Sequence, residues 1–311
     1  MSRHPDRTGI SRRDLLRLGL GAAAGLILSP SLAAAAAQHM RKIPKTGEPL
    51  PAIGLGTWQT FDVGISSDER AGPREVLKLF AEQGGRVIDS SPMYGHAETV
   101  VGDLGAELGL DDRLFLATKV WTTGRDAGIR QMEASLRKMR TQRMDLMQIH
   151  NLLDWRTQLR TLRDWKANGR VRYIGITHYT EHAYDDLARV MASEDIDFVQ
   201  FNYSILSRAA ERRLLPLAQE KQIAVLVNKP FETAGLFSRV RGKALPPWAA
   251  DFDCRSWAQY FLKFILGHPA VTCALPATAK PQHLLDNMQA GLGRLPDAAL
   301  RERMAEYLQR L

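Results

Sequence analysis

The chain has 311 residues, of which 45% are hydrophobic and 24% charged, and its formal net charge is +8. Its two cysteines are too few for a disulfide framework, and it has no CxxC, no HExxH and no His/Cys cluster with the spacing of metal ligands. Lys and Arg form no dense block with interleaved aromatics, so the sequence does not indicate a nucleic-acid-binding surface.

The first 37 residues are expected to be an export signal, separate from the fold. Arg12 and Arg13 are adjacent, a mildly apolar run follows at residues 18–28, and an alanine tract comes after it. This pattern resembles the twin-arginine (Tat-type) export signals of bacteria. The apolar run is shorter than the roughly twenty residues needed to cross a bilayer. We therefore expect cleavage near residues 35–37, contact with the Tat export machinery and a periplasmic location. An uncleaved tether to the inner membrane is the main alternative.

Strand and helix signals alternate in the remaining chain, residues 38–311. Strand-length apolar runs are predicted at 53–55, 86–88, 114–118, 144–149, 171–176, 197–201, 223–227 and 270–275. Helical spacing of apolar residues is found at 74–83, 98–108, 128–139, 158–168, 181–190, 210–221, 256–266 and 281–289. Eight such pairs are typical of an α/β protein with a single (β/α)8 TIM barrel and a parallel eight-stranded sheet.

The composition of the strands supports this prediction. They are almost continuously apolar, as strands are when helices cover the sheet. A doubly wound open sheet is the alternative, but no GxGxxG follows the first strand. The stretch 228–253 has no strand signal and is predicted to form a lid or binding loop. Cys273 lies in a predicted buried strand, and we expect it and Cys254 to be free thiols.

Polar residues follow three consecutive predicted strands. Asp89 ends the second strand and Tyr94 lies in the loop after it, Lys119 follows the third strand, and His150 follows the fourth. Reactive groups of a parallel barrel gather at the carboxyl ends of its strands, so these four side chains are expected to meet. Each one alone is as readily explained as a turn former, a solvated strand end or a hydrogen-bonded core histidine.

Together these residues resemble a known family. "VIDSSPMYG", "ATKVW" and "IHN" are similar to the Asp, Tyr, Lys and His motifs of the aldo-keto reductases. "PAIGLGTW", "IGITHY" and "VQFNYS" resemble the first, fifth and sixth strands of that family, and "LPATAKPQHLLDNM" its adenosine-binding segment. The resemblance covers about residues 41–290. It implies an oxidoreductase that transfers hydride between NADP(H) or NAD(H) and a small carbonyl or alcohol substrate.

The residue types fit such chemistry. Tyr94 is the candidate general acid and base, although the reference pKa of a phenol, about 10, is high for proton donation at neutral pH. Lys119 would lower that pKa, and Asp89 would hold Lys119 in place and keep it charged. His150 would bind and orient the substrate oxygen.

The resemblance also implies a cofactor cleft and a substrate pocket. The cofactor-binding residues would be Thr57, Thr177, His178, Gln200, Asn228, Pro230, Thr278, Lys280 and Asn287. Trp58, Trp121 and Asn151 would line the substrate pocket.

Several of these positions depart from the family pattern. His178 stands where many members have asparagine, and Asn228 stands where a tyrosine commonly stacks on the nicotinamide. The usual clamp on the 2′-phosphate aligns with Ala277 and His283, leaving Lys280 as a nearby cation. Asn151 replaces a pocket tryptophan of some members, which favours a more open or more polar pocket. These departures leave the choice between NADP and NAD open.

Two other classes of function are weighed against the reductase. An exported barrel-fold binding or regulatory protein would hold the nucleotide as a structural ligand with little turnover. A barrel hydrolase would need paired catalytic carboxylates or a metal cluster, and the sequence offers neither.

Overall fold

Eight parallel strands form the central sheet in the described part of the computed structural model, which comprises Met1 and residues 37–311. Residues 2–36, which make up nearly all of the predicted export signal, lie outside this part of the chain. In chain order the strands are β3 (Leu55–Gly56), β4 (Val87–Asp89), β5 (Phe115–Val120), β6 (Met144–His150), β7 (Val171–Thr177), β8 (Phe198–Asn202), β9 (Ala224–Asn228) and β10 (Cys273–Ala274). Each strand pairs with its neighbours in sequence order.

The sheet closes on itself between its first and last strands. Parallel bridges join Ile53 to Ala274 and Gly56 to Ala277, and the Gly54 amide donates to the Ala274 carbonyl at 2.9 Å. Closure removes the unpaired edges that an open sheet would leave. The predicted (β/α)8 barrel is therefore confirmed, and the open doubly wound sheet is excluded.

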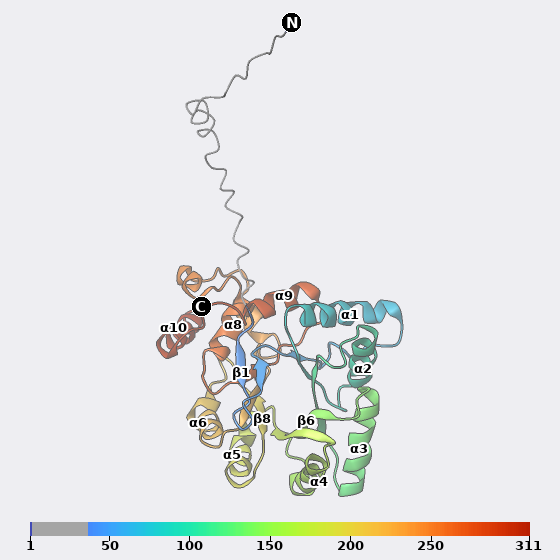
Figure 1. Cartoon of the computed structure of the whole chain (residues 1–311). Coiled ribbons are helices and arrows are strands. Elements are labelled where there is room, and N and C mark those ends of the chain that lie inside the picture. Colours follow the sequence, from blue (N-terminus) through green and yellow to red (C-terminus); the bar gives the residue numbers. More distant parts are fainter. Residues whose placement is uncertain (2–36) are drawn as a thin grey trace. The chain divides into compact units, whose positions relative to one another are not determined.

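Helices surround the barrel (Figure 1). They are α1 (Ser67–Glu82), α2 (Ala97–Glu107), α3 (Arg125–Lys138), α4 (Trp155–Ala167), α5 (Tyr184–Ser193), α6 (Leu214–Glu220), α8 (Trp257–Leu266) and α9 (Pro281–Gln289). Helix α1 begins seven residues before the predicted start because Ser66 and Glu69 form a capping box, and Pro73 is accommodated in its first turns. Among the described residues, no helix combines the length and apolarity needed to cross a membrane.

A short hairpin and two helices were not predicted from the sequence. Strands β1 (Met40–Lys42) and β2 (Pro49–Pro51) pair antiparallel. Leu50 of β2 and Ile43, which follows β1, join the inner barrel cluster with Phe115 and Phe198. The hairpin therefore closes the amino end of the barrel. Helix α7 (Gly235–Arg239) lies within the predicted loop 228–253, and α10 (Ala298–Gln309) ends the chain.

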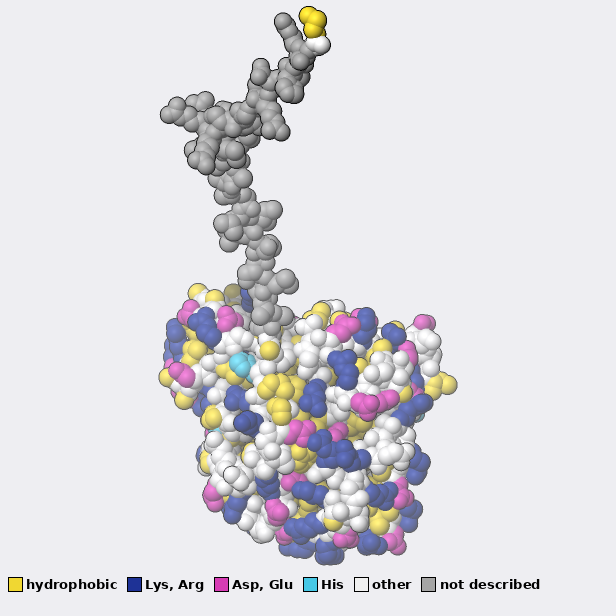
Figure 2. Space-filling view, in the orientation of Figure 1, with side chains coloured by type: hydrophobic (Ala, Val, Ile, Leu, Met, Phe, Trp, Pro, Cys, Tyr) yellow, Lys and Arg dark blue, Asp and Glu magenta, His cyan; other side chains and the backbone are white. Residues whose placement is uncertain are grey.

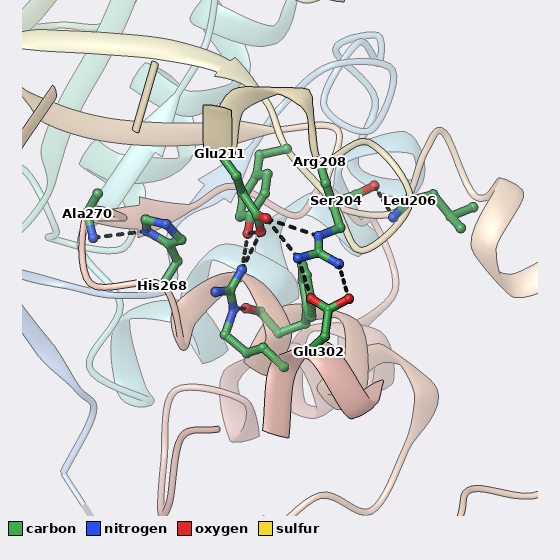
Figure 3. A network of polar contacts seen from close by, with 10 residues as sticks. Ser204, Leu206, Arg208, Glu211, His268, Ala270 and Glu302 are labelled. Atoms are coloured by element: carbon green, nitrogen blue, oxygen red, sulfur yellow. Dashed lines mark hydrogen bonds and ion pairs between the residues drawn. The ribbon is translucent and has the colours of Figure 1, made fainter. Parts of the chain in front are cut away.

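A polar network fastens α10 to the barrel (Figure 3). Arg208, in the loop after β8, pairs with Glu302 of α10 at 2.7 Å. In the opposite direction, Arg301 of α10 pairs with Glu211 at 2.6 Å. Arg301 is almost completely buried, so its ion pair replaces the water that the guanidinium loses.

Elsewhere in the core, Cys254 and Cys273 are both buried free thiols, as expected.

Candidate active site

Three consecutive strands bring the four predicted polar residues together. Asp89 and His150 are the last residues of β4 and β6, and Lys119 is the penultimate residue of β5. Tyr94 lies in the turn after β4, where its amide donates to the Ser91 carbonyl at 3.0 Å. The parallel register places all three strand residues at the carboxyl end of the barrel, which the hairpin leaves open.

Lys119 is completely buried and paired with Asp89. Its Nζ donates to Asp89 Oδ2 at 2.7 Å and to the Ser90 carbonyl at 2.6 Å. Burial by itself lowers the pKa of the Lys119 ammonium. The Asp89 carboxylate and Tyr94 raise that pKa by more than burial lowers it, so the net shift is upward. The expected Lys119–Asp89 pair is therefore present. Because the pKa shift is upward, Lys119 stays a cation at neutral pH.

Tyr94 lies directly against this cation, but its pKa is not lowered overall. Lys119 Nζ lies 5.2 Å from the centre of the Tyr94 ring. Burial raises the pKa of the Tyr94 phenol above 10, Lys119 acts against that rise, and Asp89 adds to it. The expectation of a net lowered pKa is therefore wrong for the protein alone, because the loss of water outweighs the ammonium.

His150 completes the group as a neutral imidazole. Its ring meets the Tyr94 ring edge-on, with the centroids 6.1 Å apart, and its Nδ1 lies 3.1 Å from Ser91 Oγ. Burial lowers the pKa of His150 to about 3, and Lys119 and His178 lower it in the same direction. The ring can therefore offer one N–H as a hydrogen-bond donor at neutral pH without carrying a charge.

Two polar residues of this site were missed by the sequence reasoning. Gln148 Nε2 donates to Asp89 Oδ1 at 3.0 Å and holds the second oxygen of the carboxylate. Gln148 lies two residues before His150 on β6, and the alternation of strand side chains could have placed both on the same side. Ser91 carried no such signal, because a serine next to a turn proline is most often a turn former.

The residues expected at the nicotinamide end lie beside this group. Thr57 Oγ1 donates to the Asp89 carbonyl at 3.1 Å. On the next strands, Gln200 Oε1 accepts from Thr177 Oγ1 at 3.1 Å and from Asn228 Nδ2 at 3.5 Å. Gln200 Nε2 and Asn228 Oδ1 are buried and have no partner among the described residues. A carboxamide group carries the complementary acceptor and donor, so this pair fits a nicotinamide amide.

His178 and Pro230 lie further along the same rim. The His178 ring stacks on Tyr179 with the two planes 7° apart, and its Nδ1 accepts from the Tyr179 amide at 3.1 Å. Pro230 belongs to a tightly wound turn in which Lys229 and Glu232 have φ angles of 49° and 50°. The His178 amide donates to the Gln200 carbonyl at 3.0 Å, so the backbone of His178 lies beside β8 while its ring stacks on Tyr179.

The residues expected at the adenosine end gather at the start of α9. Thr278 Oγ1 accepts from the Lys280 amide at 3.0 Å, and Lys280 is the residue that precedes the first turn of the helix. Asn287 is buried on the inner side of α9. Pro281 has no amide hydrogen, and the His283 and Leu284 amides both donate to the Lys280 carbonyl at 3.1 Å. The exposed Lys280 is therefore the main group at this helix end that could attract a phosphate.

The expected pocket residues surround the mouth of the site. Trp58 and Trp121 are 45% and 37% exposed, and the Trp121 ring lies 6.5 Å from the His150 ring. Gln131 holds the Trp121 backbone by accepting from its amide at 2.6 Å. Asn151 has a φ of 54°, and its buried Oδ1 has no hydrogen-bond partner in the described part of the chain. Within residues 37–311, no His, Cys, Asp and Glu cluster could hold a metal ion.

Comparison with known proteins adds an independent finding. A family model described as "Aldo/keto reductase family" matches residues 52–303. Methylglyoxal reductase YeaE of Escherichia coli strain K12 is 30% identical over 245 residues, which cover 76% of this chain and 84% of that protein. NADH-specific methylglyoxal reductase of the same strain is 24% identical, and the match covers 87% of this chain and 100% of the relative.

Solved structures give the same result. An aldo-keto reductase from Klebsiella pneumoniae in complex with NADPH has 25% identity and a TM-score of 0.72, and the match covers 87% of this chain and 95% of that one. An aldo/keto reductase of that organism in complex with NADP and acetate has 26% identity and a TM-score of 0.69, with coverage of 83% and 93%. The matched residues 52–303 include every strand of the barrel.

Proposed function

This chain belongs to the aldo/keto reductase family, and from that membership we propose that it is an NAD(P)(H)-dependent oxidoreductase of small carbonyl compounds and the matching alcohols, with Tyr94 as its general acid and base. The observation that carries the assignment of Tyr94 is the buried Lys119–Asp89 pair directly beneath the phenol. A fully buried ammonium is costly unless it is paired, and here the paired ammonium also lies 5.2 Å from the centre of the tyrosine ring.

The proposed reaction needs a hydride and a proton. The residues that would hold the nicotinamide are Gln200, Asn228, Thr177 and Thr57, and a nicotinamide bound there would supply the hydride. Tyr94 then gives its proton to the oxygen of the substrate carbonyl. As the phenolate forms, Lys119 stabilises the new negative charge at close range, where little water screens it. In the reverse direction the phenolate takes the proton of the alcohol.

His150 is proposed to bind the same oxygen. Because its pKa lies far below neutrality, it acts as a neutral hydrogen-bond donor and does not compete with Tyr94 as an acid. Two donors that converge on the carbonyl oxygen polarise the bond and fix the face that receives the hydride. Trp58 and Trp121 would hold the carbon skeleton of the substrate against the site.

The compartment is a separate proposal. We propose that residues 1–37 direct export of the folded barrel 38–311 to the periplasm through the twin-arginine route, with the nucleotide bound during passage. The proposal rests on Arg12-Arg13, the short apolar run and the alanine tract. It raises the question of cofactor recycling, because pyridine nucleotides are scarce outside the cytoplasm. A second substrate could oxidise or reduce the bound nucleotide in place.

The test is a steady-state assay on the purified full chain. Two relatives are named methylglyoxal reductases, so methylglyoxal with NADPH or NADH is the first combination to assay. We expect many turnovers per protein molecule, followed as loss of the reduced nucleotide. At most one turnover per molecule, across a panel of aldehydes and ketones, would instead support the nucleotide-holding binding protein.

A further inference from the structure

The barrel carries its positive charge on one side. Residues 125–172, which include α3 and α4, contain twelve Lys and Arg and five Asp and Glu, for a net charge of +7. The rest of residues 38–311 contains 25 Lys and Arg and 27 Asp and Glu, for a net charge of −2. The sequence showed no basic block because these residues are spaced along the chain. The fold gathers them, since α3 and α4 pack side by side.

The outer sides of these two helices form an array that we call the arginine face. It consists of Arg130 and Arg137 of α3 and Arg156, Arg160 and Arg163 of α4, all of them exposed. The spacings of seven residues on α3 and of four and seven on α4 put each set on one side of its helix. Figure 2 shows Lys and Arg gathered along the edge of the molecule where Figure 1 places α4.

Most of this charge is not neutralised by the protein. In the described part of the chain, Arg130, Arg137 and Arg160 have no acidic partner within ion-pair distance, whereas Arg163 pairs with Glu194 at 2.7 Å. Arg156 lies over the ring of Trp155, 4.3 Å from its centre. A surface that keeps several unpaired guanidinium groups close together has a positive potential that attracts anions.

The arginine face also lacks apolar anchors. No large hydrophobic side chain of residues 122–172 is exposed, and Trp155 is half-buried beneath Arg156. Protein–protein interfaces usually centre on a buried apolar or aromatic core, which this surface cannot supply. The arginine face instead offers planar guanidinium groups, and each of them can donate two hydrogen bonds to two oxygens of one phosphate group.

We propose that the arginine face binds the phosphate headgroups of an anionic phospholipid bilayer. The array extends over the outer sides of two neighbouring helices, so it fits a flat layer of phosphates better than a single small ligand. The export signal expected at residues 1–37 would bring the chain to a membrane. Helices α3 and α4 form part of the side wall of the barrel, so contact along them leaves the catalytic mouth open to water.

Vesicle sedimentation of the full chain tests the proposal. Vesicles contain phosphatidylcholine alone or phosphatidylcholine with phosphatidylglycerol. We expect binding only to the anionic vesicles and weakening as salt is added. The variant Arg130→Gln/Arg137→Gln/Arg160→Gln should bind about a hundredfold more weakly, because each basic residue near such a surface contributes about fivefold. Reductase activity should not change.

A matched variant controls for net charge. Lys42→Gln/Lys78→Gln/Lys221→Gln removes the same three charges from exposed positions outside the arginine face, and the first 37 residues are identical in all chains. It should bind within a fewfold of wild type. Equal losses in the two triple variants would overturn the proposal, as would absence of wild-type binding. Tighter binding to duplex DNA or RNA at the same salt, with the same dependence on the three arginines, would replace the bilayer with a nucleic acid.

Discussion

The Ser91 hydroxyl and Nδ1 of His150 form a hydrogen bond. The two atoms are 3.1 Å apart, and Ser91 Oγ itself accepts from the Met93 amide at 3.2 Å. Ser91 is completely buried, and among the described residues His150 Nδ1 and the Met93 amide are the only hydrogen-bond partners of its hydroxyl. A buried hydroxyl proton needs an acceptor, and the Met93 amide can only donate, so we expect Nδ1 of the neutral ring to be unprotonated. The ring proton is then expected on Nε2, the nitrogen left free for the substrate.

Replacing Ser91 with alanine should release this constraint. We expect Ser91→Ala to mix the two His150 tautomers and to lower kcat by about tenfold, with little change in nucleotide affinity. NMR of 15N-histidine-labelled protein reports the tautomer directly. Ser90→Ala is the matched control, since the neighbouring Ser90 hydroxyl bonds Thr57 and not His150. If the His150 nitrogen resonances are unchanged in Ser91→Ala, the serine does not set the tautomer.

Tyr94→Phe should abolish the chemistry and leave the fold intact. The substitution removes only the hydroxyl, so nucleotide binding, followed by fluorescence quenching, should stay within a fewfold of wild type. The rate of carbonyl reduction should fall by at least about 10²–10⁴-fold, the usual contribution of a general acid. If Tyr94→Phe turns over any active substrate as fast as the wild type does, Tyr94 is not the general acid.

The pH profile of reduction should be flat through neutrality. Reduction needs Tyr94 protonated, and its raised pKa keeps it so until the pH exceeds 10. On the acid side, His150 stays neutral because its pKa is about 3. With saturating reduced nucleotide, we expect kcat/KM to be constant from about pH 6 to pH 9 and to fall only above that. A break near pH 6.5 that disappears in His150→Asn would show a protonated histidine at work.

Nucleotide choice should depend on a single lysine. Lys280 is exposed before the first turn of α9, with Ala277 and His283 at the usual clamp positions. A lysine is a point charge without the bidentate geometry of arginine, so we expect a modest preference for NADPH over NADH. Titration of both nucleotides against wild type and Lys280→Ala measures it. A preference that survives Lys280→Ala undiminished would place the 2′-phosphate elsewhere.

Export should require the paired arginines near the amino end. In cells that express the wild type, we expect a shortened chain in the periplasm, cut between residues 33 and 38. Arg12→Lys/Arg13→Lys should leave a full-length chain in the cytoplasm, and fractionation with immunoblotting distinguishes the two. If the wild-type chain is already full-length and cytoplasmic, export is excluded and the protein is better explained as a cytosolic reductase.

The barrel and the position of its polar residues were predictable because both follow from local patterns. Apolar runs that end in Asp89, Lys119 and His150 specify strands and the edge where they meet. Contacts between distant segments were not predictable in this way. The hairpin that holds Ile43 and Leu50 is made of strands only three residues long, too short for a periodic signal. The balance of burial against charge at Tyr94 likewise depends on packing that no short motif encodes.

The barrel is joined along a seam between β3 and β10, each of which has only two residues. Thr57 follows one side of this seam and Thr278 the other, and the bridge from Gly56 to Ala277 lies between them. A nucleotide held at its nicotinamide end by Thr57 and at its adenosine end by Thr278 would contact both sides of the seam and hold the first and last strands together. Dissociation of the nucleotide would then increase amide hydrogen exchange first at the residues of the seam. A chain exported in the folded state that lost its nucleotide would also lose the stabilisation of this seam.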